Sequence, residues 1–231
     1  MKNKILLLFT TTTLLTCSNS DDGSQIVEPN KTVATYDIIF TNYWNETDHG
    51  PLPNNSHWSP LVGVNHNSEA TFLEIGGIAS QGIEDIAEDG VNTNFQNDVL
   101  ESVSNGNSEQ YISGSSLYLS NGNVIEIKDL EISQDFPFLT LVSMIAPSPD
   151  WMVFINGFHL RNTDDSNWKD SIQIDLFVYD AGTDSGICYS APNSDITPHV
   201  SISSLKGIMP FNDSKVATLD IILKEVSVLT P

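Results

Sequence analysis

Basic residues are scarce in this chain. Its 231 residues include 9 Lys and Arg against 30 Asp and Glu, which gives a formal net charge of -21 at pH 7. A nucleic-acid partner requires a basic face opposite its phosphates, and anionic lipid attracts proteins through the same positive charge. The composition therefore argues strongly against nucleic acid and against electrostatic binding to anionic lipid. It favours solubility in salt water and the binding of divalent cations.

Cysteine is also scarce, because Cys17 and Cys188 are the two in the chain. Cys17 belongs to an N-terminal leader, which leaves Cys188 without a partner for an internal disulfide. The fold must therefore rest on its hydrophobic core, even in an oxidising compartment. No sequence neighbour of Cys188 supplies a catalytic base, so we expect this cysteine to be a small buried hydrophobe.

The apolar run at residues 5–16 is too short to span a bilayer and suits the hydrophobic region of a secretory signal peptide. The stretch from Leu14 to Cys17 resembles a bacterial lipobox, although Thr16 is larger than the Gly, Ala or Ser usual before the cysteine. We expect residues 1–16 to be removed as a signal peptide and Cys17 to carry lipid. The alternative is a plain signal peptide with an incidental cysteine.

Residues 17–32 are expected to be the lipidated cysteine and a flexible tether, because residues 18–32 have almost no apolar content. Asp21 and Asp22 resemble the export signals of bacterial surface lipoproteins. We therefore expect a secreted protein that is lipid-anchored to the bacterial outer membrane and exposed at the cell surface. The tether leads into one domain at residues 33–231.

This domain is predicted to be mostly β. Segments of strand length, either apolar or alternating between apolar and polar, occupy residues 36–41, 117–119, 124–127, 139–146, 151–160, 172–178 and 216–229. Asn121-Gly122 predicts a hairpin between the second and third of these segments. One short helix is expected near residues 80–89, where Ser80 can cap the start and Gly90 can end it. Asn and Ser fill residues 92–107, which we predict to be a long loop. Together these elements indicate an all-β antiparallel sandwich.

Three aspartates give the strongest functional signal. Asp150 opens one predicted strand, and Asp180 follows another that ends at residue 179. The short connection between the two strands predicts antiparallel neighbours, whose hairpin register brings both aspartates to the same end of the sheet. Gly182 and Gly186 allow a sharp turn after that, so Asp184 can fold back toward the pair.

Three carboxylates held together repel one another, so either their pKa values rise or a cation neutralises them. Calcium suits such a group because it takes six to eight oxygen ligands. No histidine or cysteine lies close to the aspartates in sequence, which disfavours zinc, and the spacing in residues 180–186 is not that of an EF-hand. The alternative is that the aspartates cap turns and face water, and their spacing alone leaves both possibilities open.

Five motifs follow one another along the chain. They span residues 40–44, 57–67, 79–90, 144–151 and 179–186. Together they resemble the N-terminal spondin domain family, known from the matrix protein F-spondin and from bacterial secreted proteins, over about residues 34–229.

The resemblance implies an antiparallel β-sandwich of about eight strands with one bound calcium ion. The family's calcium ligands fall on Asp150, Asp180 and Asp184, with a turn carbonyl near Ala181 as a further ligand. In animals the domain serves matrix attachment and cell adhesion, and no enzymatic activity follows from the resemblance. The animal members carry cysteines between the two calcium motifs, whereas residues 156–168 contain none here.

We therefore expect a surface-anchored, calcium-binding adhesion or ligand-binding module. Its partner would be extracellular matrix, a glycan or a protein, with Trp151 and Tyr179 as candidate contact residues. The alternatives are a calcium-dependent polysaccharide hydrolase and a purely structural envelope protein. A serine hydrolase is disfavoured because no serine has a G-x-S-x-G setting.

Histidine and tryptophan leave further alternatives. His49, His57 and His66 could form a second metal site or an acid–base pair, but we expect them to hydrogen-bond their loop to the sandwich. The four tryptophans could line a sugar-binding face, but we expect most of them to be core or rim residues.

Overall fold

The computed structural model describes residues 31–229, so the signal peptide, Cys17 and nearly all of the tether lie outside the described residues. The strands are β1 (Thr32–Asn42), β2 (His57–Trp58), β3 (Val62–His66), β4 (Ser108–Ser113), β5 (Leu117–Tyr118), β6 (Val124–Ser133), β7 (Phe138–Ala146), β8 (Trp151–His159), β9 (Ser171–Leu176), β10 (Tyr179–Asp180), β11 (Ser203–Ser204) and β12 (Ala217–Val228). The helices are α1 (Glu46–His49), α2 (Gln81–Asp89) and α3 (Thr93–Ser104).

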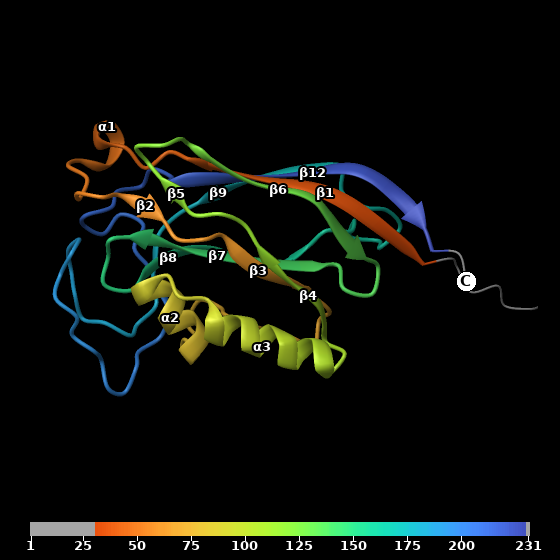
Figure 1. Ribbon diagram of the computed structural model, residues 1–231, viewed down its shortest axis with the longest axis horizontal. Coiled ribbons are helices and arrows are strands. Elements are labelled where there is room, and N and C mark those ends of the chain that lie inside the picture. Colours follow the sequence, from red (N-terminus) through yellow and green to blue (C-terminus); the bar gives the residue numbers. More distant parts are fainter. Residues whose placement is uncertain (1–30, 230–231) are drawn as a thin grey trace, which may run out of the picture.

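Two antiparallel sheets pack face to face (Figure 1). The first has the strand order β6-β1-β12-β9. The second has the order β11-β10-β8-β7-β2-β5, with β3 pairing along β7 and β4 along β3. Within the described residues, eight strands have five residues or more and four have two residues. The predicted all-β sandwich of about eight strands is confirmed.

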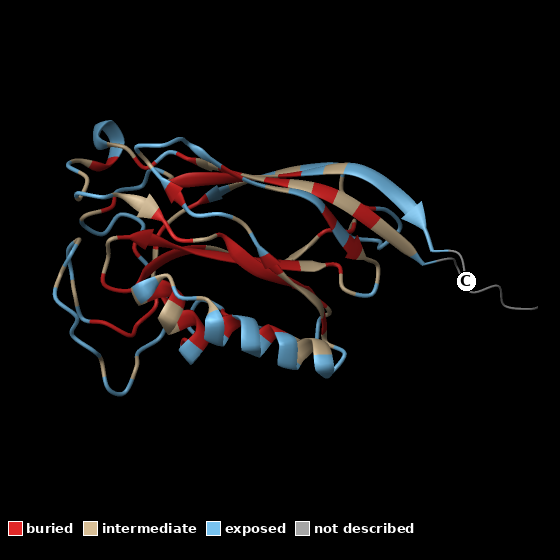
Figure 2. Ribbon diagram, viewed as in Figure 1, coloured by how far each residue is buried: buried red, intermediate tan, exposed pale blue. Residues whose placement is uncertain are grey.

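The main core lies between the sheets (Figure 2). Side chains of a strand point alternately to opposite faces, so every second residue of β1 enters this core. Ala34, Tyr36, Ile38 and Phe40 are fully buried there. Burying each large side chain of this kind stabilises the fold by about 1.5–3 kcal/mol.

Helices α2 and α3 cover the outer face of the second sheet and form a second core with it (Figure 1). The prediction for α2 is confirmed. The Ser80 hydroxyl accepts a hydrogen bond from the Ile83 amide at 3.3 Å, and Gly90 ends the helix in the left-handed conformation. Ile83 and Ile86 are fully buried against the sheet.

The loop predicted at residues 92–107 is wrong, because most of this segment forms α3. Its many Asn and Ser residues have low helix propensity, which is why the sequence indicated a loop. Phe95 and Val99, four residues apart, lie on one face of the helix and are fully buried. Tertiary packing of that face outweighs the low propensity.

The hairpin predicted around Asn121-Gly122 is also wrong. The turn itself forms, since the Asn121 amide donates to the Tyr118 carbonyl at 2.8 Å. However, β5 pairs with β2 in the second sheet, whereas β6 pairs with β1 in the first. The chain between β5 and β6 crosses from one sheet to the other. Strand β6 forms a long hydrogen-bonded ladder with β1, whereas Leu117 of β5 is buried in the core.

Candidate metal centre

The structure brings Asp150, Asp180 and Asp184 to one end of the sandwich, as the sequence predicts. Strand β8 pairs with β10 so that Asp180 lies opposite Trp151, and Asp150 directly precedes that residue. The predicted long hairpin is wrong, because β9 pairs with β12 in the first sheet. The chain changes sheets between β9 and β10, and β10 is the part that reaches β8.

Asp150 is fully buried and organises the turn after β10. Its Oδ2 accepts hydrogen bonds from the amides of Thr183 at 2.9 Å and Asp184 at 3.1 Å. Its carbonyl accepts from the Ala181 amide at 3.0 Å. Its Oδ1 is buried and has no hydrogen-bond partner. Buried polar atoms are nearly always paired, so this carboxylate oxygen is an exception among the described residues.

The other two aspartates hold the same turn. Asp180 Oδ1 accepts from the Gly182 amide at 2.9 Å. Asp184, which is 2% exposed, accepts from the Gly186 amide at 2.6 Å and the Ser194 amide at 2.5 Å. A carboxylate has about four lone-pair sites, so these contacts leave capacity for a cation.

Burial and mutual repulsion disfavour charge at this end of the molecule. Burial raises the pKa of Asp150, and the charge of Asp184 adds to the rise. Burial and then the charge of Asp150 raise the pKa of Asp180 to about 6. Within residues 31–229, no Lys, Arg or His forms an ion pair with any of the three aspartates. The site thus concentrates negative charge without a protein counter-ion.

A fourth carboxylate, which the sequence analysis missed, comes from α2. Glu88 Oε1 is buried and has no hydrogen-bond partner. Burial raises the pKa of Glu88, a contact with the Thr183 side chain opposes the rise, and the charges of Glu84, Asp184 and Asp150 add to it. Glu88 lies 62 residues before Asp150 in sequence, and only its place in the Ala79–Gly90 motif could have pointed to it.

Oxygen-rich, buried and unpaired groups suit calcium by their chemistry. Within residues 31–229, one other group is more compact: one ligand atom from each of Glu84, Asp195 and His199 lies within 4.8 Å of the other two, which is not so for the three aspartates.

Comparison with known proteins decides the family. The Spondin_N family model matches residues 34–218. The chain belongs to the Spondin_N family. Human Spondin-2 is 27% identical over 192 residues, covering 81% of this chain, and chicken Spondin-1 is 28% identical over 202 residues, covering 84%. The match spans 57% of the length of Spondin-2 and 25% of that of Spondin-1.

Of the three histidines considered in the sequence analysis, His66 and His57 make structural contacts. The ring nitrogens of His66 lie 2.7 Å from the Asn67 carbonyl oxygen and 2.9 Å from the Thr140 hydroxyl, and burial lowers its pKa. His57 stacks on Tyr118. In the described part of the chain, His49, His57 and His66 do not form a metal-ligand group.

Two expectations about exposure are wrong. Trp151 is 1% exposed, so it belongs to the core and cannot meet a partner. Its ring packs edge-on against Tyr189 and Phe211. Cys188 is exposed, because the segment after Gly186 leaves the sheets as a surface loop that no layer covers. The core placement expected for most tryptophans is confirmed, since all four are buried.

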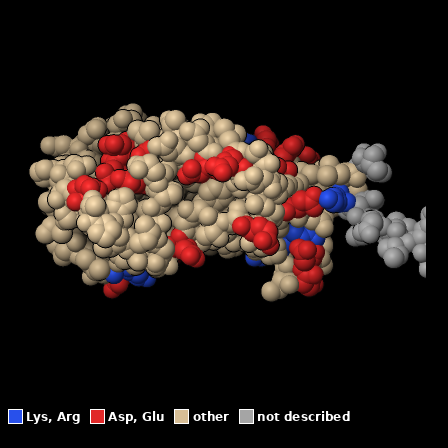
Figure 3. Space-filling view, turned by 90° about the horizontal axis from the view of Figure 1, so that it is seen from below, with Lys and Arg blue, Asp and Glu red and all other residues tan. Residues whose placement is uncertain are grey.

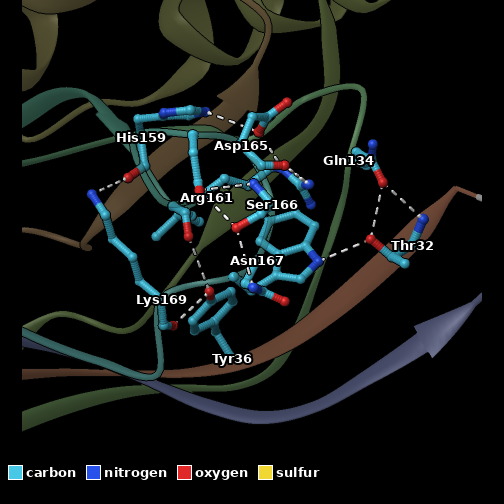
Figure 4. Close-up of polar contacts among 12 residues, drawn as sticks. Thr32, Tyr36, Gln134, His159, Arg161, Asp165, Ser166, Asn167 and Lys169 are labelled. Atoms are coloured by element: carbon cyan, nitrogen blue, oxygen red, sulfur yellow. Dashed lines mark hydrogen bonds and ion pairs between the residues drawn. The ribbon is translucent and has the colours of Figure 1, made fainter. Parts of the chain in front are cut away.

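A cavity of about 660 Å³ lies at the opposite end of the spondin domain, beside the start of β1. Figure 4 shows its polar side chains contacting one another. Arg161 donates to the Asp165 carboxylate and lies over the Trp168 ring at 5.1 Å. Trp168 Nε1 donates to the Thr32 hydroxyl at 3.0 Å. Asp165 is committed to an ion pair with Arg161.

The spondin domain exposes much acidic surface. Figure 3 views the molecule from the side of α2 and α3 and shows far more Asp and Glu than Lys and Arg. No helix among residues 31–229 is long and apolar enough to cross a membrane.

Proposed function

We propose that the chain is a calcium-stabilised binding module that acts in adhesion or ligand capture outside the cell. One observation carries the proposal. Asp150 is a fully buried carboxylate with one orphaned oxygen, surrounded by Asp180, Asp184 and Glu88 without a protein cation. Several buried negative charges without a counter-ion are costly, and a bound dication removes that cost.

Asp150, Asp180 and Asp184 would hold the ion, and Glu88 could add a fourth carboxylate. A bound calcium ion supplies positive charge and a fixed centre for oxygen ligands. The chain's own contribution is the turn at residues 180–186, which amide hydrogen bonds to the aspartates already fold around that point. A surface fixed in advance loses less entropy when a partner binds.

Exposed apolar residues at the same end are the natural contacts for a partner. Ile187 and Met209 are both 84% exposed. Ile187 follows directly after the turn at residues 180–186. Met209 lies two residues before Phe211, whose ring packs on Trp151. These two residues replace Trp151 as candidate anchors.

The proposed lipid anchor would join the domain at the end where β1 begins. Strand β1 starts at Thr32 at one end of the sandwich (Figure 1). Asp150 directly precedes β8, whose first residues pair with the last residues of β7 at the other end. A lipid on Cys17 would therefore hold the loops around the aspartates away from the membrane. This arrangement suits a module that meets partners at the cell surface.

The binding proposal is tested on arrays of matrix proteins and glycans, with calcium or with a chelator. We expect calcium-dependent binding that Ile187→Ser and Met209→Ser weaken at least tenfold while calcium affinity is unchanged. Binding that ignores both calcium and these substitutions would overturn the proposal. Glycan turnover that requires calcium and is lost in Asp184→Asn would establish the hydrolase alternative instead.

A further inference from the structure

We infer that Glu84, Asp195 and His199 form a second metal site, which takes a transition-metal dication of the zinc class. Glu84 lies on α2, and the other two residues lie in the loop between β10 and β11. One ligand atom from each residue lies within 4.8 Å of the other two. The site differs from the proposed calcium centre in its residues and in its chemistry.

The imidazole decides which metals suit this site. Neutral histidine nitrogen is a ligand for zinc, copper, nickel and iron, whereas calcium takes oxygen ligands. Two carboxylates and one imidazole leave a fourth position for water or a further donor, as in sites with three protein ligands.

The distances are those of ligands around an ion and not those of hydrogen bonds. His199 Nε2 lies 3.6 Å from Asp195 Oδ1 and 3.9 Å from Glu84 Oε1. Hydrogen bonds between such atoms are shorter than about 3.2 Å. Two ligand atoms bound to zinc at about 2.1 Å lie roughly 3.4 Å apart at the tetrahedral angle. The two His199 distances need shifts of only a few tenths of an ångström, and the Glu84 and Asp195 oxygens already lie within 4.8 Å of each other, so small side-chain movements would place an ion between the three groups.

The backbone holds the loop ligands in place. Asp195 pairs with Asp184 in an isolated β-bridge, and the Val200 amide donates to the Gly182 carbonyl at 2.9 Å. Gly182 has φ 78°, and a Cβ there would lie 2.3 Å from the Val200 carbonyl oxygen, so only glycine allows this close approach. The Thr197 hydroxyl donates to Asp195 Oδ2 at 2.7 Å and leaves Oδ1 toward His199.

The ligand atom that α2 contributes is also available to a metal ion. Glu84 Oε1 and His199 Nε2 have no hydrogen bond within the described residues, and their side chains are 18% and 26% exposed. Glu88 lies one turn further along α2, and its Oε1 is buried and unpartnered. The ion would therefore fasten the loop that carries Asp195 onto α2, beside the aspartates.

The test is zinc titration of the full chain by calorimetry, with calcium saturating. We expect one zinc ion per chain, and His199→Gln should lower its affinity at least tenfold. Glu84→Gln and Asp195→Asn should each weaken it as well. His159→Gln is the matched control, because His159 Nε2 lies 4.0 Å from the Asp165 carboxylate without a second carboxylate in its group.

Two results would overturn the site: no zinc uptake by the wild type, or equal affinity in His199→Gln and the wild type. Circular dichroism checks that each variant is folded. Asp180→Asn separates this inference from the calcium proposal, because it should abolish the calcium response and leave zinc binding within about twofold. Limited proteolysis gives a second readout, since zinc should slow cleavage in residues 186–200 of the wild type but not of His199→Gln.

Discussion

At the scale of single residues, the calcium proposal depends most on Asp150. It is fully buried, amides hold one of its oxygens, and the other oxygen has no partner. A charged carboxylate in such surroundings is unfavourable unless a cation lies beside it. The charge state of this group should therefore respond to both protons and calcium.

Without calcium, the folded domain should become more stable as the pH falls from 7.5 to 5. Asp150 and Glu88 have raised pKa values, and that of Asp180 is about 6, so the folded state binds protons that the unfolded chain releases. Stability is then lost as the pH rises through about 6 and is fully present below about 4. Urea unfolding of chelated protein at several pH values measures this effect.

The Asp180→Asn variant is the control for this prediction, because it should flatten the pH dependence. With calcium bound, the trend should reverse, since protons compete with the ion for the same oxygens. Chelated protein that gains stability on going from pH 5 to 7.5 would show that these carboxylates are not held as described.

Glu88→Gln should have two opposite effects. It removes one negative charge near Asp150 and Asp184, so the calcium-free protein should become more stable. It also removes a candidate ligand, so calcium affinity should fall roughly tenfold. Thermal melts and calcium titrations measure the two effects. Asp89→Asn, on the exposed side of α2, should change neither, and an unaltered calcium affinity in Glu88→Gln would exclude Glu88 from the site.

The sequence predicts part of this residue-scale picture. Asp150, Asp180 and Asp184 were identified because short turns and adjacent strands bring them together along one stretch of chain. Glu88 and His199 were not identified as site residues, because their approach depends on how α2 and a surface loop pack on the second sheet. No local spacing encodes those contacts.

At the scale of secondary-structure elements, the packing of α2 on α3 positions Glu84 and Glu88. Gly82 makes this possible, because a Cβ there would lie 2.6 Å from the Phe95 amide nitrogen and 2.7 Å from its Cα. The two helices approach so closely that no larger residue fits between them.

Gly82→Ala should therefore destabilise the domain by about 1–3 kcal/mol, since backbone and not a mobile side chain blocks the new methyl group. Calcium affinity should fall as well, because α2 carries Glu88. Urea unfolding measures the first effect and calcium titration the second. Gly122→Ala is the control, because its new methyl group would lie 3.8 Å from the Leu117 side chain, and its stability should lie within about 0.5 kcal/mol of the wild type.

Elements with a strong local sequence pattern were predicted well. Elements whose structure depends on the sheet that they pack against were not. The alternation in β1 and the capped start of α2 follow from sequence alone. Helix α3 and the separation of β5 from β6 depend on which surface each segment covers. A turn signal such as Asn121-Gly122 says that the chain reverses, but it does not say into which sheet.

At the scale of the whole molecule, β1 starts at one end of the sandwich (Figure 1), and the aspartates lie at the other, where β8 begins and pairs with β10. The lipid proposed on Cys17, which lies outside the described residues, would add a membrane anchor to this picture. Cys17→Ala should move the protein from the membrane fraction to the soluble fraction and abolish labelling by palmitate. A Cys17→Ala variant that stays in the membrane fraction, or a wild type that takes up no palmitate, would rule out the lipid anchor.

The central claim is that Asp150, Asp180 and Asp184 bind one calcium ion that stabilises the fold. Its most direct test is the melting temperature of the wild type and of Asp180→Asn, with saturating calcium and with chelator. At 100-fold excess over Kd, calcium should stabilise the wild type by about 2.7 kcal/mol, or roughly 5–10 °C. Asp180→Asn should lose most of this shift, whereas Asp175→Asn, whose carboxylate pairs with Lys215 at the surface, should keep it. Equal melting temperatures of the wild type with and without calcium would contradict the account.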